Sequence, residues 1–129
     1  MGTIRVFLLD DSVTFLESLE AYLALHAEIM VVGRAQSGLE ALEQVPLLRP
    51  DVVLVDLEMP EMNGLVVTLK LKALPNPPRV VMLTFHYERP YRELAEAVQV
   101  DRFVSKKNVP LELVPILLDL QGQKKKAAS

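Results

Sequence analysis

The sequence predicts an α/β fold in which a parallel sheet carries helices on both faces. Five short apolar runs, each the length of a strand, alternate with segments whose apolar residues recur at helical spacing. The connections between them are short, and no repeat of the solenoid type is present. Because strand-helix-strand units cross over with one handedness, all five strands should point the same way. Their carboxyl ends then share one edge, where open α/β sheets bind ligands.

Three of the expected strands lie in the first half of the chain. They are residues 4–9, 29–35 and 52–55, and the second has a more exposed end. The third is uninterrupted by any polar residue, which is typical of a strand covered on both faces in the middle of a parallel sheet. It runs directly into Asp56. A strand-capping or turn role for this aspartate alone is the simplest alternative to a role in ligand binding.

Serine residues mark the starts of the two helices in this half. Ser12 is the expected N-cap of the first, and Ser37 opens an S-x-x-E capping box for the second. Pro46 should bend or end the second helix, because proline removes a backbone donor. The first helix has an apolar face made of Phe15, Leu16, Leu19, Tyr22, Leu23 and His26.

The second half adds strands at residues 79–84 and 102–105. The helix after Gly64 is expected to bury Leu65, Val66, Leu69, Leu71 and Leu74. The next helix has Pro90 in its first turn and an apolar face of Leu94, Ala97 and Val98.

The last helix begins near Pro110, and it contains a second proline, Pro115. In a helix interior a proline costs about 3 kcal/mol. We therefore expect this helix to start late or to bend near Pro115.

The composition is that of one globular domain. Of its 129 residues, 50% are hydrophobic and 24% are charged. The absence of cysteine excludes disulfides and thiolate metal sites and favours the cytoplasm. No apolar run reaches the roughly 18 residues of a membrane span, and the start lacks the basic-then-apolar pattern of a signal peptide. The net charge of −3 argues against general nucleic-acid binding.

Carboxylate, hydroxyl and ammonium side chains stand at the carboxyl ends of four of the expected strands. They are Asp10, Asp11, Asp56, Thr84 and Lys106. Three carboxylates form an oxygen-rich site that suits Mg²⁺. A carboxylate beside such an ion can attack an activated phosphoryl group and form an aspartyl phosphate. A lysine ammonium and a threonine hydroxyl can then donate hydrogen bonds to the phosphoryl oxygens.

From Ile4 to about Leu120 the chain resembles the receiver domain of two-component response regulators. The matching residues, in order, are Asp10 and Asp11, Asp56 with Met59, Pro60 and Gly64, then Thr84 and Lys106. The resemblance implies a flavodoxin-like, doubly wound five-stranded parallel sheet in the order 2-1-3-4-5. It also implies a receiver domain over residues 1–121, followed by a basic C-terminal tail or linker stub over 122–129.

The same resemblance assigns roles to single residues. Asp56 would accept a phosphoryl group from the phosphohistidine of a sensor histidine kinase or a phosphotransfer protein. Mg²⁺ would be held by Asp11, Asp56 and the backbone carbonyl of Glu58, with Asp10 acting through a metal-bound water. Thr84 and Lys106 would bind the phosphoryl oxygens, and Phe103 would be the switch aromatic that turns inward with Thr84. Such a protein changes its partner-binding surface, can form a homodimer, and catalyses only its own phosphorylation and dephosphorylation.

Some residues depart from the family pattern. Gln99 and Arg102 stand where glycine is frequent, Lys107 replaces a proline, and Phe85 replaces a small residue beside the site. Glu58 and His86 are expected to tune the lifetime of the phosphoryl group.

Three alternatives stay open on the sequence. One is a metal-dependent hydrolase with an aspartyl intermediate, and another is an interaction module that is not phosphorylated. In the third, the chain is the receiver part of a DNA-binding regulator, because Leu83 to His86 resemble receivers attached to helix-turn-helix domains. The sequence does not identify the kinase, the pathway or the output partner.

Overall fold

The computed structural model describes residues 3–86 and 88–128, with side chains as far as Gln123. Within these residues one parallel sheet has the strand order β2-β1-β3-β4-β5, so the predicted fold class and order are confirmed. Each strand lies within one residue of its predicted range. The strands are β1 (Ile4–Leu9), β2 (Ile29–Ala35), β3 (Val52–Asp56), β4 (Arg79–Thr84) and β5 (Arg102–Ser105).

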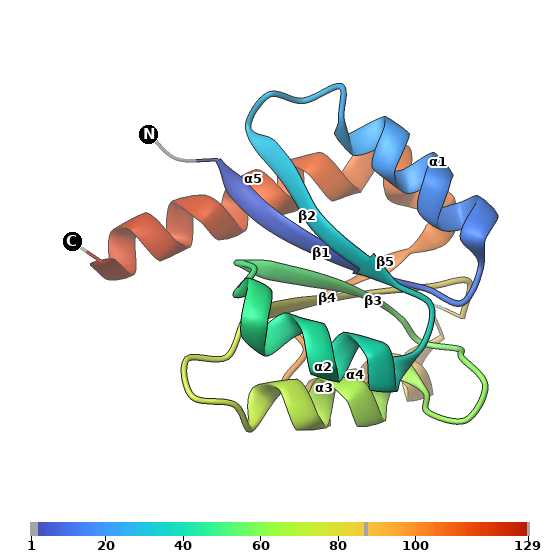
Figure 1. Ribbon diagram of the computed structural model, residues 1–129. Helices are drawn as coiled ribbons and strands as arrows, with labels where there is room; N and C mark the ends of the chain where they lie inside the picture. The colour runs from blue at the N-terminus through green and yellow to red at the C-terminus, as the bar shows by residue number, and fades with distance from the viewer. Residues whose placement is uncertain (1–2, 87, 129) are drawn as a thin grey trace.

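Helices cover both faces of this sheet (Figure 1). On one face lie α1 (Val13–Leu23) and α5 (Val109–Ala128), and a short 3-10 turn at Lys106–Asn108 leads into α5. On the other lie α2 (Gly38–Leu48), α3 (Gly64–Lys72) and α4 (Arg89–Ala97). Successive strand residues point to opposite faces, so the sheet separates two apolar cores. Leu8 belongs to the core under α1 and α5, and Phe7 to the core under α2 and α3.

Polar side chains cap the helices that begin beside the carboxyl edge of the sheet. The Ser12 hydroxyl accepts a hydrogen bond from the Phe15 N–H at 3.2 Å, as the predicted N-cap requires. Ser37 caps α2 in the same way. The Asn63 side chain caps α3 by accepting from the Leu65 N–H at 2.9 Å, a cap that the sequence analysis missed. Each cap satisfies a backbone donor that the helix leaves unpaired.

The predicted apolar face of α3 is confirmed at Leu71 and wrong at Val66 and Leu69, and the predicted face of α4 is wrong at Leu94 and Ala97. The helix α3 buries Val67, Thr68 and Leu71, whereas Leu69 is 59% exposed. In α4 the buried residue is Ala95, and Leu94 is 51% exposed. The inward side of α3 therefore differs from the one that apolar spacing predicted.

Of the two expectations for α5, the late start is wrong, and the bend near Pro115 stays a prediction. The helix begins at Val109, and Pro115 lies inside it. The hydrogen bond that this proline cannot make would have gone to the carbonyl of Leu111, a residue that is 79% exposed. The backbone stays helical through residues 122–128, while the side chains of Lys124 to Lys126 and all of Ser129 lie outside the described residues. The domain boundary at residue 121 stays a prediction.

None of the helices in the described part of the chain combines the length and the apolar character that a membrane span requires.

Candidate functional site

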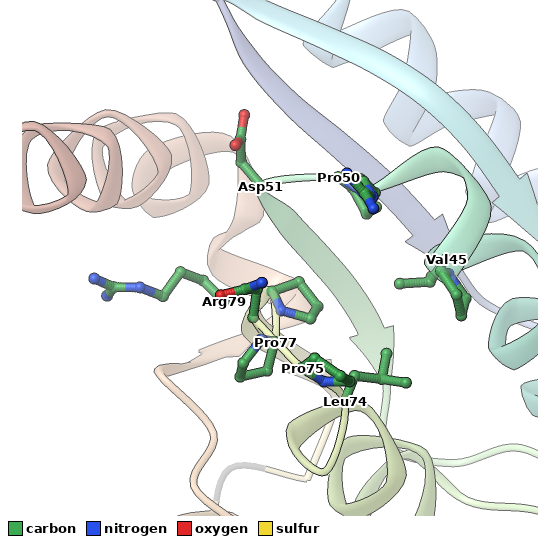
Figure 2. A pocket seen from close by; sticks show the side chains of 11 residues that line it. Val45, Pro50, Asp51, Leu74, Pro75, Pro77 and Arg79 are labelled. Atoms are coloured by element: carbon green, nitrogen blue, oxygen red, sulfur yellow. The ribbon is translucent and has the colours of Figure 1, made fainter. Parts of the chain in front are cut away.

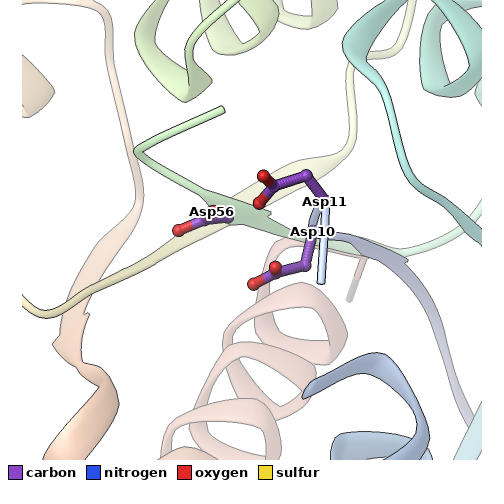
Figure 3. Close-up of side chains that lie close together, drawn as sticks. All are labelled: Asp10, Asp11 and Asp56. Carbon is purple, nitrogen blue, oxygen red and sulfur yellow. The ribbon is translucent and has the colours of Figure 1, made fainter. Parts of the chain in front are cut away.

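Three carboxylates meet at the carboxyl ends of β1 and β3. Asp10 and Asp11 follow β1, Asp56 ends β3, and their side chains point to the same side (Figure 3). Each offers an oxygen atom that lies within 4.8 Å of those offered by the other two. Asp10 and Asp56 are buried, whereas Asp11 is exposed to solvent. The site is therefore open on one side and closed on the other.

Lys106 reaches this cluster from the end of β5. Its ammonium Nζ lies 2.8 Å from Asp10 Oδ2 and 3.1 Å from Asp56 Oδ1. The lysine side chain is only 9% exposed. Burial lowers the pKa of the ammonium, but its hydrogen bond to Asp10 and the nearby carboxylate charges outweigh that effect and raise the pKa above its usual value. Lys106 therefore stays charged and bridges the two buried carboxylates.

Asp56 is poised differently from an ordinary surface aspartate. Burial, followed by repulsion from the charge of Asp10, raises the pKa of Asp56 from 3.8 to about 6. The charge and hydrogen bond of Lys106 and a hydrogen bond from the Glu58 backbone oppose this rise. A carboxylate that is costly to ionise gains from a nearby cation.

Backbone geometry holds Asp10 and Asp56 in place. The Ser12 N–H donates to Asp10 Oδ1 at 2.8 Å, so both carboxylate oxygens of Asp10 are engaged. At the other strand, the Gly64 N–H donates to the Leu57 carbonyl at 2.8 Å. A Cβ atom on Gly64 would lie 2.4 Å from the carbonyl oxygen of Asp56. Only glycine lets α3 begin this close to the end of β3.

Thr84 and His86 form the neighbouring wall. Thr84 ends β4, which pairs with β3 in a register that places Leu83 beside Asp56. Its buried hydroxyl accepts a hydrogen bond from the His86 N–H at 2.9 Å. The His86 ring lies 2.9 Å, Nε2 to Oε2, from the Glu58 side chain. The two loops that follow β3 and β4 are thereby joined through His86.

Three phenylalanines lie near the end of β5: Phe103 on β5 itself, Phe85 just after β4 and Phe15 in α1. Phe103 is half-buried on β5, in register with Met82, and packs against the cluster of apolar residues under α4. The rings of Phe15 and Phe85 lie 4.3 and 5.5 Å from Lys106 Nζ. The sequence analysis missed the contact between Phe15 and Lys106, because helical spacing placed Phe15 only on the apolar face of the first helix. Its position in the first turn after the two aspartates was the available signal.

The donor set fits a magnesium ion. Mg²⁺ prefers oxygen ligands and uses one or two carboxylates together with water. Three carboxylates and one ammonium leave two uncompensated negative charges when all are ionised, which matches a dication. The exposed Asp11 gives an ion a direct path from solvent.

A separate cavity of about 610 Å³ lies at the opposite edge of the sheet (Figure 2). It is lined by the end of α2 and the prolines that precede β4. Its charged residues Arg49, Asp51 and Arg79 lie near the amino ends of β3 and β4. None of the predicted site residues lines this cavity, so it does not belong to the acidic site.

Comparison with known proteins matches residues 6–117 to the response regulator receiver domain family. A protein-glutamate methylesterase/protein-glutamine glutaminase 1 of Carboxydothermus hydrogenoformans is 40% identical over 108 residues, covering 82% of this chain and 32% of the relative. The corresponding protein of Geobacillus kaustophilus is 40% identical over 116 residues, covering 88% and 33%. The chain thus spans about a third of the length of these curated relatives.

Solved structures agree with this assignment. The signal receiver domain of NarL from Mycobacterium tuberculosis has a TM-score of 0.88 and 32% identity, covering 95% of this chain and 99% of that one. The response regulator domain of Thermotoga maritima CheB has a TM-score of 0.83 and 28% identity, covering 93% and 97%.

Proposed function

Because this chain belongs to the response regulator receiver domain family, we propose that Asp56 is the residue that accepts the phosphoryl group. A receiver is a phosphoacceptor switch of two-component signalling, and Asp56 is the member of the acidic cluster that best suits the acceptor role. It is 5% exposed, and Lys106 Nζ lies 3.1 Å from its Oδ1 atom. Asp10 contacts the same ammonium, but its other oxygen already accepts from the Ser12 N–H, whereas Asp56 ends the middle strand β3. The contact between Asp56 and the buried cation of Lys106 is the observation that carries the proposal.

The transfer step needs only a bond exchange at phosphorus. An oxygen of the Asp56 carboxylate attacks the phosphorus of a phosphohistidine on a sensor kinase or a phosphotransfer protein. The new O–P bond forms as the P–N bond breaks, and the electron pair of that bond leaves with the imidazole nitrogen. Lys106 then transfers its hydrogen bond from the carboxylate to a phosphoryl oxygen, where negative charge accumulates.

Asp11, Asp56 and the backbone carbonyl of Glu58 would hold Mg²⁺, and Asp10 would act through a metal-bound water. When bound, the ion would neutralise charge on the phosphoryl oxygens. Asp10 also orients Lys106, because the 2.8 Å contact keeps the ammonium beside Asp56.

The switch would run through Thr84. Its oxygen accepts from the His86 N–H, which leaves the hydroxyl hydrogen to donate to a phosphoryl oxygen. Moving Thr84 toward Asp56 would pull on the loop that leads into α4, and Phe103 would turn inward behind it. Phosphorylation then shifts a two-state equilibrium by stabilising one arrangement of this loop and β5. The pair between His86 and Glu58 would tune the lifetime of the phosphoryl group.

The wider role follows from the same chemistry. We propose that the chain acts in the cytoplasm and changes its affinity for a protein partner or for a second copy of itself. It would catalyse only its own phosphorylation and dephosphorylation, without direct binding to nucleic acid or membrane. The methylesterase and glutaminase names belong to relatives about three times as long.

Intact-mass analysis after incubation with Mg²⁺ and acetyl phosphate tests the assignment. The wild type should gain one base-labile phosphoryl group, and Asp56→Asn should gain none. Asp119→Asn is a matched control, because Asp119 is exposed and pairs with Arg102 away from the site. An adduct of equal yield on Asp56→Asn would refute the assignment. Release of free phosphate from a phosphate ester, with no adduct, would instead indicate a hydrolase.

A further inference from the structure

Two aromatic rings flank the ammonium group of Lys106. Phe15, in the first turn of α1, has its ring centroid 4.3 Å from Nζ, and Phe85, just after β4, has its ring centroid 5.5 Å away. Both distances lie within the roughly 6 Å over which a cation is attracted to the face of a ring. The Phe15 ring is half-buried, whereas Phe85 is 60% exposed. Phe15 is therefore the closer and better desolvated partner.

The ring of Phe15 supplies something that the carboxylates cannot. An ammonium has three N–H donors, and two of them are directed at Asp10 and Asp56. The lysine side chain is almost fully shielded from water, so the remaining side of the cation needs another favourable neighbour. An aromatic face attracts the cation through its quadrupole but carries no net charge. It therefore does not repel an incoming phosphoryl group as a third carboxylate would.

We propose that Phe15 is a positioning residue for phosphoryl transfer, because its ring holds the Lys106 ammonium at the edge of the pocket beside Asp56. The inference rests on the proposed acceptor role of Asp56. With the ring in place, the Lys106 ammonium stays close to Asp56 and moves only a short distance from the carboxylate to a phosphoryl oxygen. Without it, Lys106 has more positions to sample, and fewer of them support the transition state.

The test changes the electrostatics of the ring and leaves its shape almost unchanged. One, two or three fluorine atoms are placed on the ring at position 15 alone, since each fluorine weakens the negative face of the ring. The rate constant for phosphorylation by acetyl phosphate is measured at saturating Mg²⁺. It should fall stepwise along the series, by about 2- to 30-fold in total, the range expected for losing a cation–π contact.

Two matched controls separate positioning from packing. The same fluorinated series at Phe7, which is buried in the core on the other face of the sheet, should leave the rate unchanged. Phe15→Tyr keeps an aromatic face and should retain most of the phosphorylation rate. Phe15→Leu keeps an apolar side chain but no aromatic face, and its phosphorylation rate should fall as far as that of the most fluorinated ring. The melting temperature of each variant is recorded, so that rates are compared among folded proteins.

The outcomes distinguish this inference from the proposed function. A flat rate along the position-15 series, with the unmodified chain phosphorylated at Asp56, overturns the role of Phe15 and leaves the acceptor assignment intact. An equal fall in the Phe7 series also overturns it. Absence of any adduct on the unmodified chain overturns the acceptor assignment, and this inference with it.

Discussion

Replacing Gly64 with alanine should both destabilise the domain and slow its phosphorylation. The added Cβ would meet three backbone atoms: the Asp56 oxygen at 2.4 Å, the Asp56 carbonyl carbon at 3.0 Å and the Leu57 Cα at 3.0 Å. A backbone atom cannot rotate away as the end of a side chain can. To restore an ordinary contact of 3.4 Å, α3 and the end of β3 must separate by about 1 Å.

The expected cost is that of forcing extra volume into a packed interior, about 1–3 kcal/mol. The separation would also stretch the 2.8 Å hydrogen bond from the Gly64 N–H to the Leu57 carbonyl. With an unfolding entropy of about 2 cal/mol/K per residue, each kcal/mol lowers the melting temperature of a chain this long by about 4 °C. The melting temperature should therefore fall by about 4–11 °C.

Two of the three backbone atoms in this contact belong to Asp56, so the same displacement would also move the acceptor carboxylate. A misplacement of about 1 Å can cost up to about 100-fold in rate. The assays are urea unfolding, thermal unfolding and the acetyl phosphate reaction followed by intact mass.

Gly122→Ala in α5 is the matched control. A Cβ at this position would meet no atom within 4 Å, so the substitution should stabilise the helix by about 0.5–1 kcal/mol. The reasoning is refuted if Gly64→Ala unfolds within about 0.5 kcal/mol of the wild type and is phosphorylated at the same rate.

Three further predictions follow from single residues. The raised pKa of Asp56 means that the folded state binds a proton more readily than the unfolded chain, so stability from this group falls as pH rises from 3.8 to about 6. In metal-free buffer at pH 7.5 the free energy of unfolding of Asp56→Asn should exceed that of the wild type by at most about 3 kcal/mol. A difference in unfolding free energy that does not shrink toward pH 4 contradicts this. Asp101→Ala should lower the free energy of unfolding in urea by about 2–3 kcal/mol, because Oδ2 accepts from Lys72 Nζ and the Val80 N–H, both at 2.7 Å. As a control, Glu93→Ala breaks an exposed pair with Arg89 and should change this free energy by less than about 0.5 kcal/mol. Equal losses in the two variants would refute the difference between the shielded and the exposed pair. Gln99 has a φ of 69°, so Gln99→Gly should raise stability by about 0.5–1 kcal/mol, and a lower melting temperature would count against backbone strain there.

The sheet could be predicted because its strands are uninterrupted apolar runs. Parallel topology then brings the strand ends to one edge, which is why Asp10, Asp56 and Lys106 could be expected together before their distances were known. The sequence also places Gln99 where glycine is frequent in the family, and the structure shows a left-handed φ of 69° there, a conformation that glycine adopts without strain.

Helix rotation was less predictable, because apolar residues lie on more than one side of the helix. In α3 Val67 and Leu71 are buried, whereas the equally apolar Leu69 stays exposed. The contact between Phe15 and Lys106 joins residues from opposite ends of the chain. No local pattern reports the distance between two such side chains.

The helix α4 is held to the sheet by few buried side chains, which bears on how phosphorylation could change the surface of this domain. Of its nine residues, only Ala95 is buried, and the apolar cluster beneath it is small. Lifting that side chain into water costs only about 1 kcal/mol, far less than unfolding the domain. Among the helices of the described residues, α4 has the fewest buried side chains, so a rearrangement of the neighbouring β4 loop needs less free energy to shift this helix than to shift any other.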